Sequence, residues 1–223
     1  MNRPEYELLS KLKTDKPATA ETKIRLTAEE EATGETAAAY QYFRDQTGRQ
    51  DVPGILKCFA TNPAFARQMV DISSSLLFCD GVLTRRQKEM IATYISQLNV
   101  CPYCFDSHGF FLMVQGAPRQ TVDDLAVNNL ARLSEAEQEL LLYLDKVERE
   151  SFKTTAEDVQ RLLDLGWLEH QIAEAVLVAA MMGFCNRVAN AFGLPPQNLL
   201  ALQFKSLCEA VWTGGPLHEL KRF

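Results

Sequence analysis

Several segments of this 223-residue chain begin with residues that cap α-helices and continue with apolar side chains at helical spacing. In a capping box, a Ser or Thr side chain and an acid or amide three residues later satisfy the open N–H groups at the start of a helix. The pairs of this kind are Thr84 with Gln87, Ser134 with Glu137 and, as a weaker version, Thr155 with Asp158. The alternation of polar and apolar residues that marks β-strands is hard to find. The sequence therefore predicts an all-α fold.

The helical pattern predicts one domain preceded by a polar arm. Residues 1–23 are polar and only weakly periodic, so we expect a mobile N-terminal arm there and a single helical domain over residues 24–223. A first helix is predicted near residues 36–46. Another is predicted after Asn62 and Pro63, because Asn caps helices and Pro suits the first helical position.

A shift of 84 residues aligns parts of the chain with one another, which would fit a degenerate internal duplication. The identities are Asp80 with Asp164, Gln87 with Gln171, Cys101 with Cys185 and Gly109 with Gly193. Four identities also arise by chance between two apolar helices, so both interpretations stay open. The second copy has no counterpart of Cys104 or His108 and would not share their chemistry.

The net charge of −6 and the pI of about 5.2 argue against nucleic acid as a partner, because binding to phosphates requires a basic patch. The densest basic stretch, Arg85 to Lys88, is interpreted as the exposed first turn of a helix. No signal peptide is recognisable at the N-terminus. The longest apolar run, residues 175–185, is shorter than the ~20 residues of a membrane-spanning helix. We therefore expect a cytoplasmic protein without a membrane partner.

Two cysteines and a histidine lie close together in the segment that begins with Cys101. Pro102 favours the first position of a helix and makes Cys101 its N-cap, which places Cys104 and His108 on the same helical face as Cys101. Two sulfurs at this spacing can close a disulfide, and a helix N-terminus stabilises a thiolate. His108 can exchange a proton with Cys104 near neutral pH. This pattern predicts a redox-active dithiol.

A zinc site is the main alternative for this motif. A structural zinc ion takes four ligands, usually from two pairs, and no second Cys/His pair stands in the sequence. The missing ligands favour redox chemistry over zinc, and a reducing compartment disfavours a purely structural disulfide. The remaining cysteines and histidines are interpreted as core or surface residues without a chemical role; they are Cys58, Cys79, Cys185, Cys208, His170 and His218.

Glu89 belongs to the predicted helix that precedes the motif. The apolar stripe of this helix consists of Met90, Ile91, Tyr94, Ile95 and Leu98. Glu89 lies on the opposite side, in line with Thr93 and Ser96. Periodicity alone therefore predicts a solvent-exposed acid.

Taken together, Glu89, Cys101, Cys104 and His108 resemble the signature of the AhpD-like alkylhydroperoxidases, in the peroxidase-related branch of the carboxymuconolactone decarboxylase superfamily. The specific feature is an acid twelve residues before a Cys-x-x-Cys pair that is followed by a histidine. The resemblance extends roughly over residues 24–196. Further matching segments are Glu30-Glu31-Ala32-Thr33-Gly34, Asn62-Pro63-Ala64, Leu83-Thr84, Glu89-Met90-Ile91-Ala92, and Asn186-Arg187 with Ala189 and Gly193.

The resemblance implies an all-helical AhpD-like fold, a homo-oligomer, and peroxide reduction without a metal or an organic cofactor. In such enzymes the second cysteine attacks the peroxide, and the first resolves its sulfenic acid as a disulfide. Carried over, Cys104 attacks, Cys101 resolves, and Glu89 with His108 forms the proton relay. The implied partners are an organic hydroperoxide as substrate and an external dithiol protein as reductant.

Some features of the sequence qualify this transfer. Some family members carry a histidine between the two cysteines, where Tyr103 stands here. The helix-end argument makes Cys101, and not Cys104, the more acidic thiol. The aromatic residues around the motif fit either an apolar pocket or simple core packing; they are Phe105, Phe110 and Phe111. The alternative function is a non-catalytic redox-sensing or protein-interaction module on the same fold.

Overall fold

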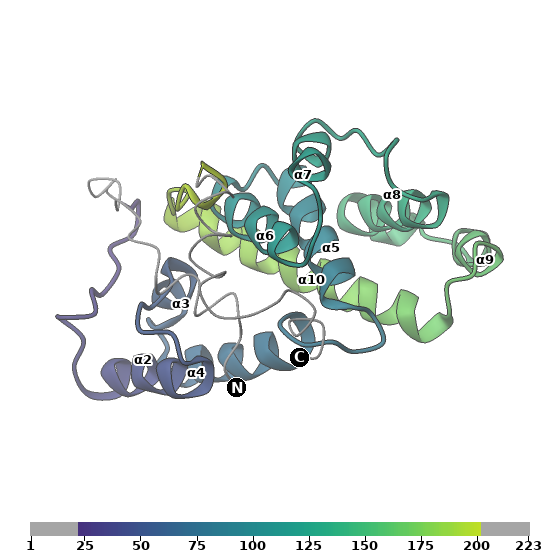
Figure 1. Ribbon diagram of the computed structural model, residues 1–223. Coiled ribbons are helices and arrows are strands. Elements are labelled where there is room, and N and C mark those ends of the chain that lie inside the picture. Colours follow the sequence, from purple (N-terminus) through teal and green to yellow (C-terminus); the bar gives the residue numbers. More distant parts are fainter. Residues whose placement is uncertain (1–21, 202–223) are drawn as a thin grey trace, which may run out of the picture.

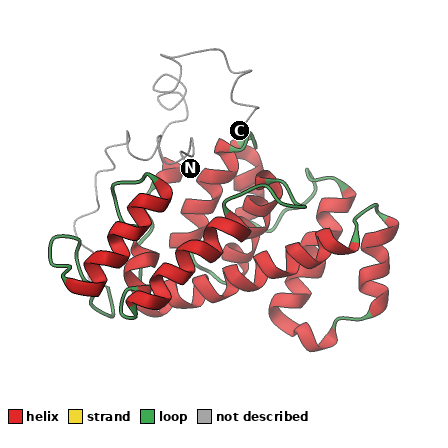
Figure 2. Ribbon diagram, turned by 90° about the horizontal axis from the view of Figure 1, so that it is seen from below, coloured by secondary structure: helices red, strands yellow, loops and turns green. Residues whose placement is uncertain are grey.

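The computed structural model describes residues 22–201, which form a bundle of helices (Figure 1). In chain order the elements are α2 (Gly34–Thr47), α3 (Gly54–Phe59), α4 (Pro63–Ile72), the π-helical η1 (Ser73–Leu77), α5 (Arg85–Leu98), α6 (Pro102–Val114), α7 (Arg119–Ala126), α8 (Glu135–Glu150), η2 (Ser151–Lys153), α9 (Ala156–Asp164), α10 (Glu169–Phe192) and η3 (Leu199–Ala201). Within this range no strand occurs, and Figure 2 shows only helices and loops. The all-α prediction is confirmed.

Local sequence signals account for where the helices begin. All three predicted capping boxes are formed, at the starts of α5, α8 and α9. The side chain of Asn62 accepts a hydrogen bond from the N–H of Phe65 at 3.2 Å, as expected for the start of α4. The helix predicted near residues 36–46 is α2. The short helix α3 was not predicted, because six residues give too little periodicity to recognise.

The larger hydrophobic cluster gives α5 and α6 a fixed position. It lies mainly between α5, α6, α8 and α10, and α5 packs most extensively against α6 and α10. Met90, Ile91, Leu140 and Val178 are fully buried in it. Burying one such side chain contributes about 1.5–3 kcal/mol. The two helices that carry the predicted site are therefore anchored in the most strongly packed part of the fold.

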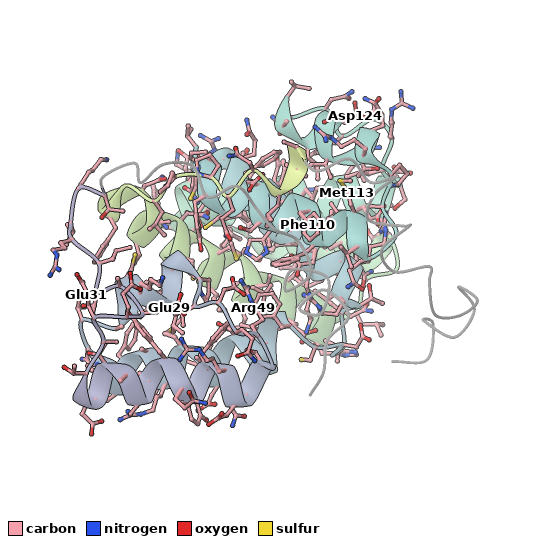
Figure 3. All side chains as sticks on the ribbon, turned by 60° about the vertical axis from the view of Figure 1, so that its left-hand side comes forward. Glu29, Glu31, Arg49, Phe110, Met113 and Asp124 are labelled. Carbon is pink, nitrogen blue, oxygen red and sulfur yellow. The ribbon has the colours of Figure 1, made fainter. Side chains whose placement is uncertain are left out.

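A smaller cluster is formed by α2, α3 and α4 beside α10, and it includes Cys185 of α10. Glu29, in the segment before α2, connects two of these helices. Its carboxylate accepts hydrogen bonds from Arg44 of α2 at 2.7 Å and from Lys57 of α3 at 3.0 Å. It also accepts from the backbone N–H of Val52 at 3.2 Å. Figure 3 shows Glu29 on the side of α2 that faces the other helices. These contacts connect the segment before α2 with α2, α3 and the loop between them.

The basic stretch at the start of α5 is largely buried, so the predicted exposed turn is wrong. Lys88 has an exposed fraction of 0% and Arg85 of 7%. Lys88 Nζ donates to Glu174 Oε1 at 2.9 Å and to the carbonyl of Leu76 at 2.7 Å. Arg85 donates to the carbonyl of Leu77 at 2.8 Å. A buried cation is tolerated where a carboxylate and carbonyls replace its water, and these partners come from other segments of the chain.

The helix α10 extends well beyond the apolar run of residues 175–185 that the sequence suggests. Among residues 22–201, it is the one helix long and apolar enough to cross a membrane, judged by length and composition. Half of its apolar window is buried inside the fold. Its buried residues include Val178, Ala179 and Met182. A core helix of a compact protein has this same character.

The predicted arm and the predicted duplication remain predictions. Of residues 1–23 the structure describes Thr22 and Lys23, and the N–H of Lys23 donates to the carbonyl of Phe192 at 2.8 Å. The rest of the arm lies outside the described residues. Cys101 and Cys185, which the 84-residue shift aligns, differ in setting: Cys101 precedes α6, whereas Cys185 lies within α10.

Candidate active site

The turn between α5 and α6 sets the position of Cys101. After α5 ends at Leu98, Val100 adopts a φ of +47°, in the left-handed region. The N–H of Cys101 then donates to the carbonyl of Ser96 at 2.9 Å. The N–H of Phe105 donates to the carbonyl of Cys101 at 2.9 Å, which opens α6. Cys101 is thus the N-cap of α6, as predicted from Pro102.

Cys101 and Cys104 are free thiols with exposed fractions of 1% and 3%. The Cys104 thiol donates to the Cys101 sulfur and, against the opposing effect of burial, lowers the pKa of Cys101 to about 7. Backbone N–H groups at the start of α6 and the Asn186 side chain add to this lowering. The same thiol hydrogen bond, together with burial, raises the pKa of Cys104 well above its ordinary value. The negative charge of the resting pair therefore lies on Cys101, as the helix-end argument predicts.

Glu89 lies between Arg85 and His108 inside the protein. Its Oε2 lies 2.7 Å from Nδ1 of His108, and its Oε1 accepts a hydrogen bond from the Arg85 guanidinium. The exposed fraction of Glu89 is 0%, so the exposed acid predicted by periodicity is wrong. Periodicity gives the wrong prediction because Arg85 and His108 replace water around the Glu89 carboxylate. Their charges and hydrogen bonds offset the desolvation free energy of burying it.

The two neighbours also decide the ionisation of Glu89. Burial would raise its pKa, but the charges and hydrogen bonds of Arg85 and His108 together lower the pKa below its ordinary value. An ionised carboxylate only accepts hydrogen bonds, so Nδ1 of His108 carries the proton between them. The other ring nitrogen, Nε2, is then the basic one in the neutral imidazole.

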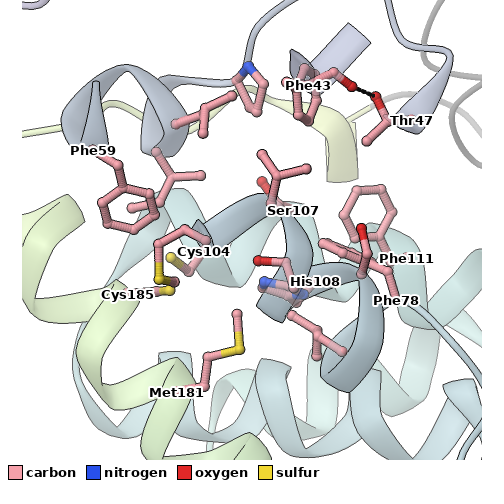
Figure 4. A pocket seen from close by; sticks show the side chains of 18 of the residues that line it. Phe43, Thr47, Phe59, Phe78, Cys104, Ser107, His108, Phe111, Met181 and Cys185 are labelled. Atoms are coloured by element: carbon pink, nitrogen blue, oxygen red, sulfur yellow. Dashed lines mark hydrogen bonds between the residues drawn. The ribbon is translucent and has the colours of Figure 1, made fainter. Parts of the chain in front are cut away.

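An apolar cavity of about 110 Å³ lies between α2–α4, η1, α6 and α10 (Figure 4). Cys104 and His108 line it from α6, whereas Cys101 and Glu89 are not among its lining residues. Much of the wall is aromatic or thioether surface, contributed by Phe43, Phe59, Phe78, Phe111, Met181 and Met182. Of the Cys101–Cys104 pair, only Cys104 therefore faces the cavity, together with the imidazole of His108.

Aromatic rings hold the imidazole of His108 in place. The ring of Phe78 is nearly parallel to it with centroids 6.4 Å apart, and Phe111 makes an edge contact at 5.9 Å. Of the aromatic residues near the motif, Phe111 lines the cavity and Phe110 is fully buried in the core. Phe105 packs against the main cluster. Both proposed roles, pocket wall and core packing, are thus present.

The remaining cysteines and histidines have different positions. Cys58 is buried, Cys79 is half-buried, and His170 is exposed. Cys185 is buried as predicted, but it also lines the cavity beside Cys104 (Figure 4). His218 and Cys208 lie outside the described residues. Within the described part of the chain, no group of three or more His, Cys, Asp or Glu side chains could hold a metal ion.

Sequence reasoning assigned no site role to Arg85 or Asn186. Arg85 could have been found, because it stands four residues before Glu89 and such residues are neighbours on a helix. Asn186 reaches the thiol pair from α10, and no local pattern indicates this contact. In the sequence, Asn186 is marked only as one of the residues that carry the family resemblance.

Comparison with known proteins supports the all-α fold and shows a family likeness in part of the chain. The sequence profile of the Carboxymuconolactone decarboxylase family matches residues 63–146, which run from α4 into α8. No curated protein matches the chain. Among solved structures, an uncharacterized peroxidase-related protein from Ralstonia eutropha JMP134, described as an alkylhydroperoxidase AhpD core, is similar with a TM-score of 0.72 and 24% identity. The similarity covers 83% of this chain and 97% of that one.

Two further solved structures share the fold. A peroxidase-related protein from Silicibacter sp. TM1040 has a TM-score of 0.71 and 24% identity, with 83% of this chain and 97% of that chain covered. A variant of the debrominase Bmp8 in complex with 2,3,4-tribromopyrrole has a TM-score of 0.62 and 16% identity, with 86% and 100% covered. At these identities the structures show the fold alone. The chain has the AhpD-like all-α fold, and residues 63–146 are similar to the Carboxymuconolactone decarboxylase family.

Proposed function

We propose that this protein is a thiol-dependent peroxidase that reduces organic hydroperoxides with Cys101 and Cys104. The observation that carries the proposal is that Cys104 and His108 face one apolar cavity, with the Glu89 carboxylate 2.7 Å behind the imidazole. A hydroperoxide with an alkyl or aryl group suits this cavity, because its organic part buries apolar surface against the Phe and Met side chains.

The geometry suggests a role for each side chain. Cys104 is the attacking thiol, because it is the member of the pair that lines the cavity. Its proton can pass to the Cys101 sulfur, to which it already donates, or to Nε2 of His108. Glu89 holds the imidazole with Nδ1 protonated and balances the positive charge that forms if Nε2 takes up a proton.

Two thiols supply both electrons for the reduction. The Cys104 sulfur attacks the terminal oxygen of ROOH, the O–O bond breaks, and ROH leaves with the proton that Cys104 released. The Cys101 thiolate then attacks the sulfenic sulfur of Cys104, and the S–O bond breaks as the disulfide forms. The leaving oxygen takes up one proton from the solvent and departs as water. An external dithiol protein restores both thiols by disulfide exchange.

The test is a thiol count before and after one equivalent of cumene hydroperoxide, followed by peptide mapping. We expect the loss of two thiols and a disulfide between Cys101 and Cys104. Cys104→Ser should abolish peroxide consumption. Cys79→Ser is the matched control, because Cys79 lies outside the cavity and bonds to the carbonyl of Ser75. If the Cys104→Ser variant consumed the hydroperoxide at the parent rate, the proposal would be wrong.

The number of turnovers separates this enzyme from a redox-sensing module on the same fold. With excess dithiothreitol as reductant, a peroxidase consumes many equivalents of hydroperoxide per chain. A sensor oxidises once and recycles slowly. Consumption that stops near one equivalent despite available reductant would favour the sensor.

Reductive debromination is a second candidate, favoured by the four Phe rings of the cavity and by the likeness in fold to the debrominase Bmp8. One aryl bromide and two thiols would give the arene, one disulfide and HBr. Bromide release from 2,3,4-tribromopyrrole, measured on the reduced protein beside peroxide consumption, distinguishes the two reactions. Bromide release with no peroxide consumption would favour reductive debromination over peroxide reduction.

A further inference from the structure

The side chain of Tyr103, which stands between the two cysteines of the motif, reaches from α6 to the start of α3. Its hydroxyl oxygen accepts a hydrogen bond from the N–H of Ile55 at 3.2 Å. The helix α3 has no side-chain cap of its own, so Tyr103 satisfies one of the N–H groups that a helix start leaves open. A Cβ atom added at Gly54 would lie 3.5 Å from Cε2 of the same ring. The outer end of the phenol therefore lies against the first residues of α3.

The hydroxyl of Tyr103 also belongs to the wall of the cavity. Tyr103 lines the cavity, and so do Pro53, Ile55 and Leu56 around the start of α3, where the hydroxyl is bound. The exposed fraction of Tyr103 is 5%, so bulk water is largely excluded from it. Its oxygen accepts from Ile55, but within residues 22–201 no group accepts its proton. Burial raises the pKa of Tyr103, so this proton stays in place at neutral pH and is available to a ligand.

The other polar side chains of the cavity wall differ from Tyr103 in this respect. The hydroxyls of Thr47 and Ser107 each donate their proton to the carbonyl four residues earlier, at 2.7 and 3.0 Å. The guanidinium of Arg49 is paired with the carboxylate two residues later. Nε2 of neutral His108 is an acceptor. The remaining polar side chains are half-buried, where water can reach them; they are Ser73, Ser74 and Gln197.

We infer that the Tyr103 hydroxyl is the binding site for an oxygen atom of the organic molecule that enters the cavity. The ligand class is an oxygenated molecule with an apolar body, such as an organic hydroperoxide or the alcohol formed from it. For the reactant, the inference rests on the proposed peroxidase function. In that reaction Cys104 takes the terminal oxygen, and Tyr103 donates a hydrogen bond to the oxygen that leaves with the organic group.

The bond from Ile55 makes Tyr103 well suited to this role. A hydroxyl that accepts one hydrogen bond becomes a stronger donor, because chains of hydrogen bonds polarise one another. The same bond fixes the phenol before a ligand arrives. Negative charge develops on the leaving oxygen as the O–O bond breaks, and a donor already in position stabilises that charge.

The test compares cumyl alcohol with cumene, which have the same apolar body and differ by one hydroxyl group. Neither compound reacts with a thiol, so NMR titration of the reduced full-length protein gives a Kd for each. Tyr103→Phe keeps the aromatic ring and removes only its hydroxyl. We expect the Kd of cumyl alcohol to rise about fivefold, as for the loss of one neutral hydrogen bond. The Kd of cumene should not rise, because a hydrocarbon accepts no hydrogen bond.

The ratio of the two Kd values separates oxygen binding from a structural role. If loss of the bond to Ile55 only loosened the cavity wall, both ligands would bind more weakly and the ratio would stay the same. Tyr143→Phe is the matched control, because Tyr143 packs against the main cluster outside the cavity and both Kd values should equal those of the parent. An unchanged ratio in Tyr103→Phe, or a parent protein that binds neither ligand, would overturn the inference.

This experiment contains no peroxide, so its outcome is independent of the peroxidase assay with Cys104→Ser. A changed ratio in a protein that consumes no peroxide would reject the proposed function and leave Tyr103 as the residue that binds the ligand oxygen. In an active peroxidase, Tyr103→Phe should also lower the second-order rate constant of Cys104 oxidation by cumene hydroperoxide, by about fivefold or more. An unchanged rate constant would overturn the assignment of Tyr103 to the leaving oxygen.

Discussion

Glu89 carries a negative charge inside the protein, where Arg85 and His108 surround it. The same contacts hold the His108 imidazole, through Nδ1, against the wall of the cavity. At the scale of a single residue, the carboxylate therefore has two roles: it balances the buried guanidinium of Arg85, and it orients the ring beside Cys104. Loss of its charge should affect stability as well as chemistry.

We expect Glu89→Gln to lower the free energy of unfolding by about 3 kcal/mol, because a neutral amide cannot balance the buried charge of Arg85. Urea denaturation measures this change. Glu30→Gln is the control, because Glu30 is exposed, and its change should stay within about 0.5 kcal/mol. Equal stability of Glu89→Gln and the parent would mean that the ion pair contributes nothing to the fold.

The turn from α5 to α6 shows a constraint at the scale of elements. The closely packed helices α5 and α6 are joined by a short segment in which the chain reverses direction. Val100 lies in this segment and has a φ of +47°. This conformation is unfavourable for a β-branched residue. The exposed fraction of Val100 is 79%, so its side chain gains little from packing there. Asn190 donates to the carbonyls of Asn99 and Val100 and stabilises the turn.

We expect Val100→Asn to raise the free energy of unfolding by about 1 kcal/mol, because Asn tolerates the left-handed region and little apolar contact is lost. Thermal or urea unfolding measures the gain. Val127→Asn is the matched control: Val127 is 74% exposed but has a φ of −110°. A gain of the same size in both variants would show that replacing an exposed apolar side chain by a polar one, and not relief of backbone strain, stabilises the protein.

At the scale of the whole molecule, buried and half-buried ion pairs join separate segments of the chain. Glu29 connects the loop before α2 with α2 and α3, Glu89 connects α5 with α6, and Glu137 of α8 accepts from Arg86 of α5 at 2.8 Å. Burial raises the pKa of each of these three carboxyls, but their cationic and N–H partners more than offset it, so each pKa lies below 4.5. The folded state therefore binds their protons less readily than the unfolded state does.

The stability that these carboxylates contribute is fully present above the ordinary pKa of 4.5 and is lost as the pH falls through their lower folded-state pKa values. We therefore expect the melting temperature to fall steeply below about pH 4.5. Thermal unfolding followed by circular dichroism at pH 7, 5, 4 and 3 measures this. The Glu29→Gln variant should lose less on acidification, because Gln does not titrate. A melting temperature that stays constant down to pH 3 would contradict the expectation.

The sequence by itself determined the helical class, the main helix starts and the reactive segment. These features depend on neighbours within a few residues: Thr84 with Gln87, Ser134 with Glu137, and Pro102 after Cys101. Local hydrogen bonds and backbone preferences act over this range, so a linear pattern records them.

Only the tertiary structure decided which polar residues are buried and which thiol of the Cys101–Cys104 pair faces the cavity. Glu89, Lys88 and Asn186 are fully buried, although polar side chains are normally found at the surface. Each is buried together with partners from other elements, such as His108 on α6 or Glu174 on α10. The same packing turns Cys104 toward the cavity. Periodicity reports only the average preference of a residue type, whereas the free energy of burying a charge depends on which partners the fold brings to it.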